Sequence, residues 1–309
     1  MNEIKKWMIS SRVPFLTASV VPVIFGVALA WQMTGQFHAL WAVITLLGVC
    51  FAQAGTNMTN DYFDHKTGTD EINESYTPFS GGSRVIQDKV VSPRQQLVGG
   101  LIAFGLAAVC GLYLWLATKG IYGRPYTIPI LAAIGFLSGF LYTATPVKFG
   151  YRGMGELFIG LNFGTFSILG AYFVQTGQLG WAPVLTSIPI GFLIAAVVYI
   201  NQFPDYAADK EVGKRHWVVI LGKKNAIPGY LFMVFGSYLA TIILILTGYL
   251  PIWALLVLIT LPLSIGATRT LFKNFDKIEE LIPANAATIK IHMTFGLLMA
   301  VAVIADKLI

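Results

Sequence analysis

The sequence contains few charged residues. Only 12% of its 309 residues are Asp, Glu, Lys or Arg, whereas soluble globular chains carry about 25%. Hydrophobic residues make up 56% of the chain, and the mean hydropathy is +0.69. So little charge argues against a soluble protein, and repeated apolar runs of about 20 residues indicate membrane-spanning helices. We therefore expect an all-α, polytopic membrane protein.

Cysteine and histidine are also scarce. Cys50 and Cys110 lie in apolar runs without disulfide or metal-binding spacing, so we expect two small buried hydrophobic side chains. The four histidines show no ligand spacing, and we expect them to be background residues, mostly at the surface. The net charge of +6 is interpreted as topology-setting charge rather than as a nucleic-acid footprint. No nucleic-acid partner is expected.

Nine apolar stretches are long enough to cross a bilayer. They cover approximately residues 13–33, 39–60, 95–118, 126–145, 154–175, 182–204, 226–248, 250–271 and 287–306.

Lysine and arginine predict the orientation of these spans. Of 21 such residues, all except Lys119, Arg124 and Lys307 lie at the N-terminus or in the loops after even-numbered stretches. The positive-inside rule places that side in the cytoplasm. We therefore expect a multi-pass protein of the cell (plasma or inner) membrane, with a cytoplasmic N-terminus.

An acidic stretch, Asn57–Asp70, ends the second apolar run. Its residues Asn57, Asp61 and Asp64 are spaced 0, +4 and +7, which places them on one face of a helix. Carboxylates beside an apolar span are costly unless they have a function or reach water. Solvated helix-end carboxylates are the simpler alternative.

A similar stretch, Asn201–Arg215, ends the sixth apolar run. Asn201, Asp205 and Asp209 are spaced 0, +4 and +8. Pro204 predicts a bend or an end of the helix just before Asp205. Because the pattern occurs twice, a function is favoured over solvated helix ends.

The repeated motif predicts one domain, 1–309, built from two four-helix halves. The halves cover approximately residues 13–145 and 154–271, and a ninth helix follows. We expect the two acidic stretches to face each other across a central cavity.

Two facing groups of carboxylates repel each other unless a cation joins them. Oxygen ligands without His or Cys favour Mg²⁺, which is usually held by carboxylates together with phosphate oxygens. The sequence therefore predicts a diphosphate bridged by Mg²⁺ at the cytoplasmic side. The cations that could neutralise this anion, or else simply set topology, are Arg84, Lys148, Lys214 and Arg215.

These motifs resemble the UbiA superfamily of intramembrane aromatic prenyltransferases. The resemblance lies in N-x-x-N-D-Y-F-D (Asn57–Asp64), in N-x-x-x-D-x-x-x-D (Asn201–Asp209) and in Leu141–Glu156. The stretches Asn60–Asp70 and Gly81–Gln87 are most similar to the 1,4-dihydroxy-2-naphthoate polyprenyltransferase branch, which serves menaquinone biosynthesis. Two departures are that Gly68 stands where much of the superfamily has the motif's last Asp, and that the loop reads G-G-S-R.

The resemblance implies Mg²⁺-dependent transfer of a polyprenyl group from its diphosphate to an aromatic acceptor. It implies that the isoprenoid tail lies in the bilayer and that Asp61, Asp64, Asp205 and Asp209 are catalytic. Tyr142 would stabilise the carbocation or orient the substrate, with an interfacial tyrosine as the alternative. Asp70 is not expected to bind metal. The implied metal ligands are Asn57, Asp61, Asp64, Asn201, Asp205 and Asp209, and the implied diphosphate ligands are Arg84, Lys148 and Lys214.

Other functions stay open at this point. Within the superfamily the acceptor could instead be 4-hydroxybenzoate, homogentisate, haem, a chlorophyllide or a glyceryl phosphate. A cation-coupled transporter would place its carboxylates near the middle of the membrane on broken helices, whereas both motifs here end a helix. A lipid-binding scaffold without catalysis is the third alternative.

Overall fold

The computed structural model describes residues 2–309 and is all-helical, as predicted. Within this range there is no β-strand, only an isolated bridge between Thr77 and Ser80. The helical segments are α1 (Glu3–Ser10), η1 (Val13–Leu16), α2 (Thr17–Thr34), α3 (Ala39–Thr67), α4 (Thr69–Ile72), α5 (Pro93–Thr118), α6 (Thr127–Phe140), η2 (Phe149–Tyr151), α7 (Gly155–Ile159), η3 (Gly160–Phe166), α8 (Ser167–Thr176), α9 (Trp181–Glu211), α10 (Trp217–Leu221), α11 (Lys223–Leu246), η4 (Ile252–Thr260), α12 (Leu261–Asn274) and α13 (Ile278–Leu308).

Eight segments within residues 2–309 are long and apolar enough to cross a membrane. They are Val13–Thr34, Ala39–Thr67, Pro93–Thr118, Gly155–Thr176, Trp181–Glu211, Lys223–Leu246, Ile252–Asn274 and Ile278–Leu308. The ninth expected span, 126–145, corresponds to the 14-residue apolar helix α6, Thr127–Phe140. The count of nine therefore stays a prediction.

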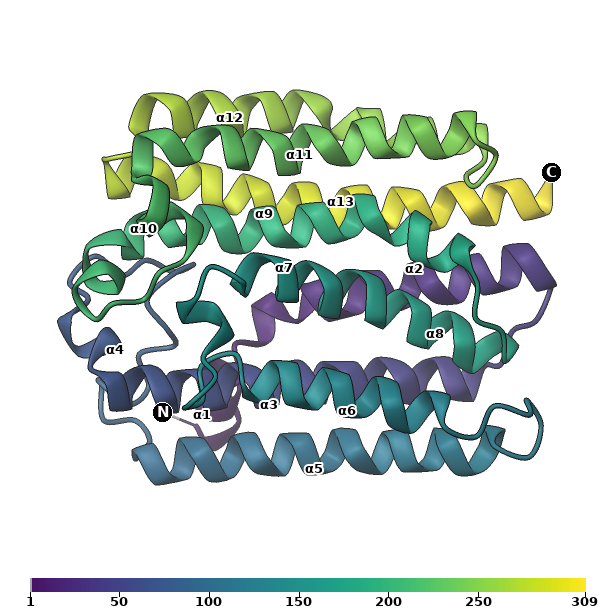
Figure 1. Ribbon diagram of the computed structural model, residues 1–309, viewed down its shortest axis with the longest axis horizontal. Helices are drawn as coiled ribbons and strands as arrows, with labels where there is room; N and C mark the ends of the chain where they lie inside the picture. The colour runs from purple at the N-terminus through teal and green to yellow at the C-terminus, as the bar shows by residue number, and fades with distance from the viewer. Residues whose placement is uncertain (1) are drawn as a thin grey trace.

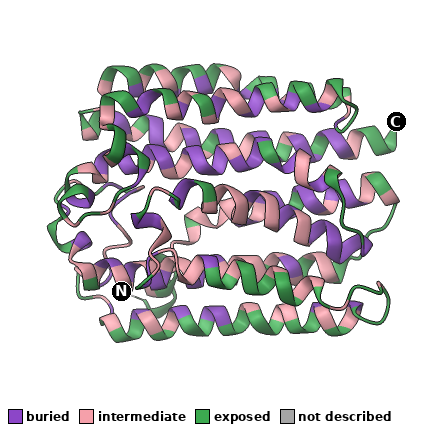
Figure 2. Cartoon of the chain, viewed as in Figure 1, coloured by how far each residue is buried: buried purple, intermediate pink, exposed green. Residues whose placement is uncertain are grey.

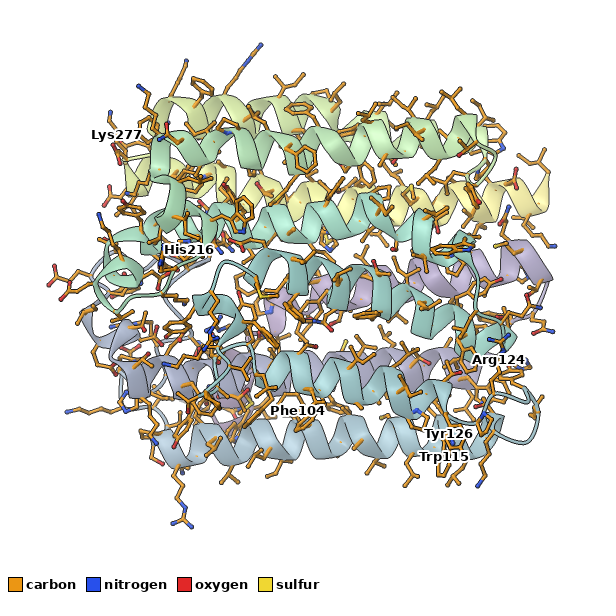
Figure 3. All side chains as sticks on the ribbon, in the orientation of Figure 1. Phe104, Trp115, Arg124, Tyr126, His216 and Lys277 are labelled. Carbon is orange, nitrogen blue, oxygen red and sulfur yellow. The ribbon has the colours of Figure 1, made fainter. Side chains whose placement is uncertain are left out.

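The helices form a bundle with their axes roughly aligned (Figure 1). α3 packs along α5 on one side, and α9, α11, α12 and α13 form the other. The short helices α4 and α10 lie at the same end (Figure 1), which also carries Lys277 and His216, whereas Arg124 and Tyr126 lie at the opposite end (Figure 3). Much of α5 and of the outer surface of α11 and α12 is exposed (Figure 2), as expected for helices that face lipid.

The main core lies among α2, α8, α9, α11 and α13. Close approach of the backbones depends on glycine at two crossings. A Cβ on Gly26 of α2 would lie 2.7 Å from the carbonyl oxygen of Ile168, and one on Gly164 would lie 2.6 Å from Cα of Gly191. Small residues at such crossings let membrane helices pack tightly. This side of the bundle is therefore closely packed.

Both acidic helices are longer than the sequence suggested. α3 continues seven residues past the expected end, to Thr67, and ends at Gly68, whose φ of 78° suits the left-handed position after a helix. α9 continues to Glu211. The acidic residues of both motifs therefore lie on regular helix.

The expectation that α9 could end at Pro204 is wrong. A proline within a helix leaves the carbonyl four residues earlier without its N–H partner. Here that carbonyl belongs to Ile200, and it accepts a hydrogen bond from Nδ2 of Asn285 in α13 at 3.3 Å. A neighbouring helix thus satisfies the freed carbonyl, as is common for proline in membrane helices.

Candidate active site

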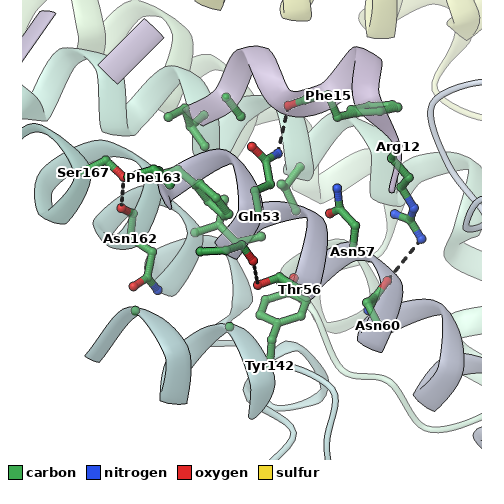
Figure 4. A pocket seen from close by; sticks show the side chains of 18 of the residues that line it. Arg12, Phe15, Gln53, Thr56, Asn57, Asn60, Tyr142, Asn162, Phe163 and Ser167 are labelled. Carbon is green, nitrogen blue, oxygen red and sulfur yellow. Dashed lines mark hydrogen bonds between the residues drawn. The ribbon is translucent and has the colours of Figure 1, made fainter. Parts of the chain in front are cut away.

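A cavity of about 790 Å³ lies between the two acidic helices and extends into the apolar part of the bundle. Polar residues gather at one end, and Figure 4 shows several of them around the space. Its polar lining includes Arg12, Asn57, Asn60, Asp64, Asp70, Tyr142, Asn201, Gln202, Asp205, Asp209 and Lys214.

The carboxylates of α3 are buried and hydrogen-bonded. Asp64 accepts from the Tyr151 hydroxyl at 2.8 Å. Asp61 forms an ion pair with Arg12 and accepts from the hydroxyl of Ser83. Asp64 lines the cavity, whereas Asp61 is absent from its lining and lies behind the loop that contains Ser83.

The carboxylates of α9 are held by a loop and by the segment that follows the helix. Asp205 accepts from Nδ2 of Asn73 at 2.8 Å and from the backbone N–H of Gly81 at 3.2 Å. Asp209 contacts Nε2 of His216 at 2.9 Å. The loop between α4 and α5 therefore bonds both acidic helices, Asp61 through Ser83 and Asp205 through Asn73 and Gly81.

Lys214 joins the two clusters. Its ammonium nitrogen lies 3.4 Å from Asp64 and 3.4 Å from Asp209, and its side chain is only 15% exposed. Burial alone would lower the pKa of Lys214, but the carboxylates of Asp209 and Asp64 raise it well above its ordinary value. A cation is therefore held between the helices.

Asp70 lies in the same cluster, although its place in the motif offered no reason to include it. It is 4% exposed and lines the cavity. Burial, followed by the nearby charges of Asp64 and Asp61, raises the pKa of Asp70 to about 9. Gly82 lies against it, since a Cβ there would be 2.8 Å from the Asp70 carboxylate.

The structure brings the other predicted metal and catalytic residues to the cavity. Asn57 lines it and donates to the carbonyl oxygen of Ser11 at 3.0 Å. Asn201 lines it and accepts from Asn285 at 2.7 Å. Tyr142 also lines it, with its ring against Gly150. Their roles stay predictions.

Three of the four predicted diphosphate ligands are not among the residues that line the cavity. Arg84 donates to the backbone carbonyl of Asp70, and its guanidinium lies 4.4 Å from the ring centre of Tyr76. Lys148 lies over the ring of Tyr151 at 4.7 Å. Arg215 is exposed. Of the predicted set, Lys214 alone lines the cavity.

Sequence analysis missed several residues of the site. Arg12 counted only toward topology, yet it bonds Asn60 and Asp61. His216 was expected at the surface but is 1% exposed, because the chain turns at Gly213, with φ of 75°, and returns to Asp209. The turn residue beside G-K-R-H was the available signal. Nothing in the sequence pairs Arg12 with α3.

The residues at the cavity fit a divalent cation by their chemistry. Carboxylate and amide oxygens are the ligands that Mg²⁺ prefers. Gln202, one residue beyond Asn201, lines the cavity and has a buried Oε1 without any hydrogen-bond partner. Within residues 2–309, no three His, Cys, Asp or Glu side chains already converge as a metal site. Instead Lys214 and Arg12 neutralise the carboxylates.

The rest of the cavity is an apolar arm between α3, α5 and α6. Its wall contains Gly105 and Gly111 of α5 and Gly135 of α6. A Cβ at any of these three glycines would meet no atom within 4 Å. The arm is therefore loosely packed, in contrast to the glycine crossings of the core.

Lys214→Met should destabilise the protein. Removing one partner of a buried ion pair leaves uncompensated carboxylates and typically costs about 3–5 kcal/mol. We expect a lower melting temperature in detergent than for the unmodified protein, and partial recovery when Mg²⁺ is added. Lys224→Met, which changes a lysine outside the cavity lining, serves as the control. A melting temperature equal to that of the control would contradict the bridging role of Lys214.

Comparison with known proteins gives one family over nearly the whole chain. The sequence model of the UbiA prenyltransferase family matches residues 19–302. The chain is 27% identical over 293 residues to 1,4-dihydroxy-2-naphthoate octaprenyltransferase of Bacillus subtilis, covering 94% of this chain and 89% of the relative. It is 28% identical over 296 residues to 2-carboxy-1,4-naphthoquinone phytyltransferase of Synechocystis, covering 96% and 92%.

A solved structure shares the fold. It is a UbiA homologue from Archaeoglobus fulgidus bound to GPP and Mg²⁺, with a TM-score of 0.60 and 15% sequence identity. The alignment covers 97% of this chain and 99% of the homologue.

Proposed function

The chain belongs to the UbiA prenyltransferase family, and from this premise we propose that it transfers a polyprenyl group to 1,4-dihydroxy-2-naphthoate. The donor would be a polyprenyl diphosphate, diphosphate would be released, and the product would serve menaquinone biosynthesis. The observation that carries the proposal is the meeting of two acidic helix ends at the polar end of an apolar cavity. The relatives with naphthoate acceptors support this acceptor over the alternatives.

In the proposed reaction the allylic C–O bond of the donor breaks and the diphosphate leaves with the electron pair. A π-electron pair of the aromatic ring forms the new C–C bond. The attacked ring carbon then loses the group it carried, either a proton to a nearby oxygen base or its carboxylate as CO₂. The apolar arm keeps water from the carbocation.

The chain's own residues prepare a place for the diphosphate. Mg²⁺, when bound, would neutralise the charge that develops on the leaving group. Asp64, Asp205 and Asp209 line the cavity and would hold it, with Asp61 behind them, and the amides of Asn57 and Asn201 add oxygen ligands. Lys214 supplies a fixed positive charge at the same end.

The loop-rich end of the bundle is proposed to face the cytoplasm of the cell membrane. It carries α4, α10 and most of the lysine and arginine residues. We also propose that the chain consists of two related halves, 13–145 and 154–271, each of which supplies one acidic helix.

The test is acceptor-dependent release of pyrophosphate by the purified, full-length protein. With Mg²⁺ and polyprenyl diphosphate alone we expect little release, and with 1,4-dihydroxy-2-naphthoate we expect rapid release and a prenylated product in the mass spectrum. Parallel reactions with 4-hydroxybenzoate and homogentisate test the acceptor. Faster turnover of either would overturn the naphthoate assignment, and release without any acceptor would overturn aromatic transfer.

A further inference from the structure

His292 of α13 is a buried polar residue that the proposed reaction leaves without a role. Its side chain is 1% exposed, and neither ring nitrogen has a hydrogen-bond partner. It nevertheless lines the cavity. Buried polar groups in proteins are nearly always paired, so an unpaired imidazole on a cavity wall indicates a ligand.

The position of His292 separates it from the acidic clusters. Asn285, which bonds Asn201 near those clusters, lies seven residues earlier on α13. Seven residues make about two helical turns, so His292 lies on the same face and roughly 10 Å further along the helix. It is therefore too far away to bind the same diphosphate as Lys214.

The isoprenoid tail does not satisfy the imidazole either, because the tail has no polar atom. The arm between α3, α5 and α6, with its open glycines, already offers apolar room for a tail. His292 lies instead on the side of the cavity near Thr17 and Ile289, where α2 and α13 pack together. What remains for this side is the acceptor.

We infer that His292 binds a hydroxyl group of the aromatic acceptor and thereby determines which rings the protein accepts. A neutral imidazole has one donor and one acceptor, and a phenolic hydroxyl offers the complementary pair. A site built to bond a hydroxyl rejects analogues that lack it, because its own polar group is then left unpaired. This inference rests on the proposed function and adds a residue that reads the acceptor.

The experiment uses the full-length protein with Mg²⁺ and measures KM for the naphthoate acceptor and for the polyprenyl diphosphate separately. His292→Phe should raise KM for the acceptor by about 10- to 100-fold and leave KM for the diphosphate within about two-fold. His292→Gln, which keeps a donor and an acceptor, should recover part of the loss. Thr288→Val, which alters a buried hydroxyl on α13 that bonds Tyr230 outside the cavity lining, should change neither value.

Two competitive inhibitors test the hydroxyl directly. The naphthoates 1-hydroxy-2-naphthoate and 4-hydroxy-2-naphthoate each lack one of the two hydroxyls. The unmodified protein should bind one of them more weakly than the other, and His292→Phe should bind both equally.

The outcomes distinguish this inference from the proposed function. If His292→Phe retains the acceptor KM and the inhibitor preference of the unmodified protein, the inference is wrong and the function stands. If the KM values for both substrates rise together, His292 is only structural. If the unmodified protein releases no pyrophosphate with any aromatic acceptor, the proposed function fails and the inference fails with it.

Discussion

Asp64→Asn and Asp205→Asn are each expected to lower kcat by about 100- to 1000-fold, the effect of removing one group that stabilises developing charge. Both carboxylates line the cavity, and they come from different helices. Asparagine has nearly the same shape and can accept a hydrogen bond from Tyr151 at position 64 or from Asn73 at position 205. The substitution therefore removes charge while preserving the packing.

The measurement is single-turnover release of pyrophosphate at saturating substrates, with the melting temperature recorded alongside. Asp88→Asn, which changes an exposed acid in the loop before α5, should behave like the unmodified protein. An active double variant, Asp64→Asn with Asp205→Asn, would refute the proposed site.

Removing divalent metal is expected to abolish turnover. Three cavity-lining carboxylates, together with a partner-free oxygen of Gln202, form a hard oxygen donor set. After treatment with excess chelator we expect pyrophosphate release to fall to the background rate, because the diphosphate then leaves without charge neutralisation. Addition of Mg²⁺ should restore the rate.

The control is the same chelator saturated with Mg²⁺ beforehand, which should have no effect. Undiminished turnover in excess chelator would sink the metal assignment and leave Lys214 and Arg12 as the cations of the site. The melting temperature should also rise with Mg²⁺ in the unmodified protein, because a ligand that binds only the folded state stabilises it.

The sequence predicted the helical architecture and the two acidic helices well. Scarce charge and long apolar runs determine the fold class, and the 0, +4, +7 spacing placed Asn57 and Asp64 on the cavity wall. Periodicity could not show where α9 ends, because the carbonyl freed by Pro204 is satisfied by Asn285, 85 residues away from Ile200. Local signals contain no information about such a partner.

The partners of the carboxylates were the least predictable part of the site. Arg12 and Asp61 are 49 residues apart, Asn73 and Asp205 are 132 apart, and Lys214 and Asp64 are 150 apart. Each pairing depends on how distant helices pack, whereas composition relates the same cations to topology. Arg84 shows the converse error of reasoning from a loop motif, because its guanidinium stacks on Tyr76 and is absent from the cavity lining.

The glycines on the two sides of the bundle differ in mechanical terms. Gly26 and Gly164 hold backbones in contact around α2, α8 and α9, so that wall is stiff. Gly105, Gly111 and Gly135 border empty space, so the wall along α5 and α6 is compliant. A stiff wall selects a ring of fixed shape, whereas a compliant wall accepts tails of different length at little cost. The same fold can thus be strict toward one substrate and tolerant toward the other.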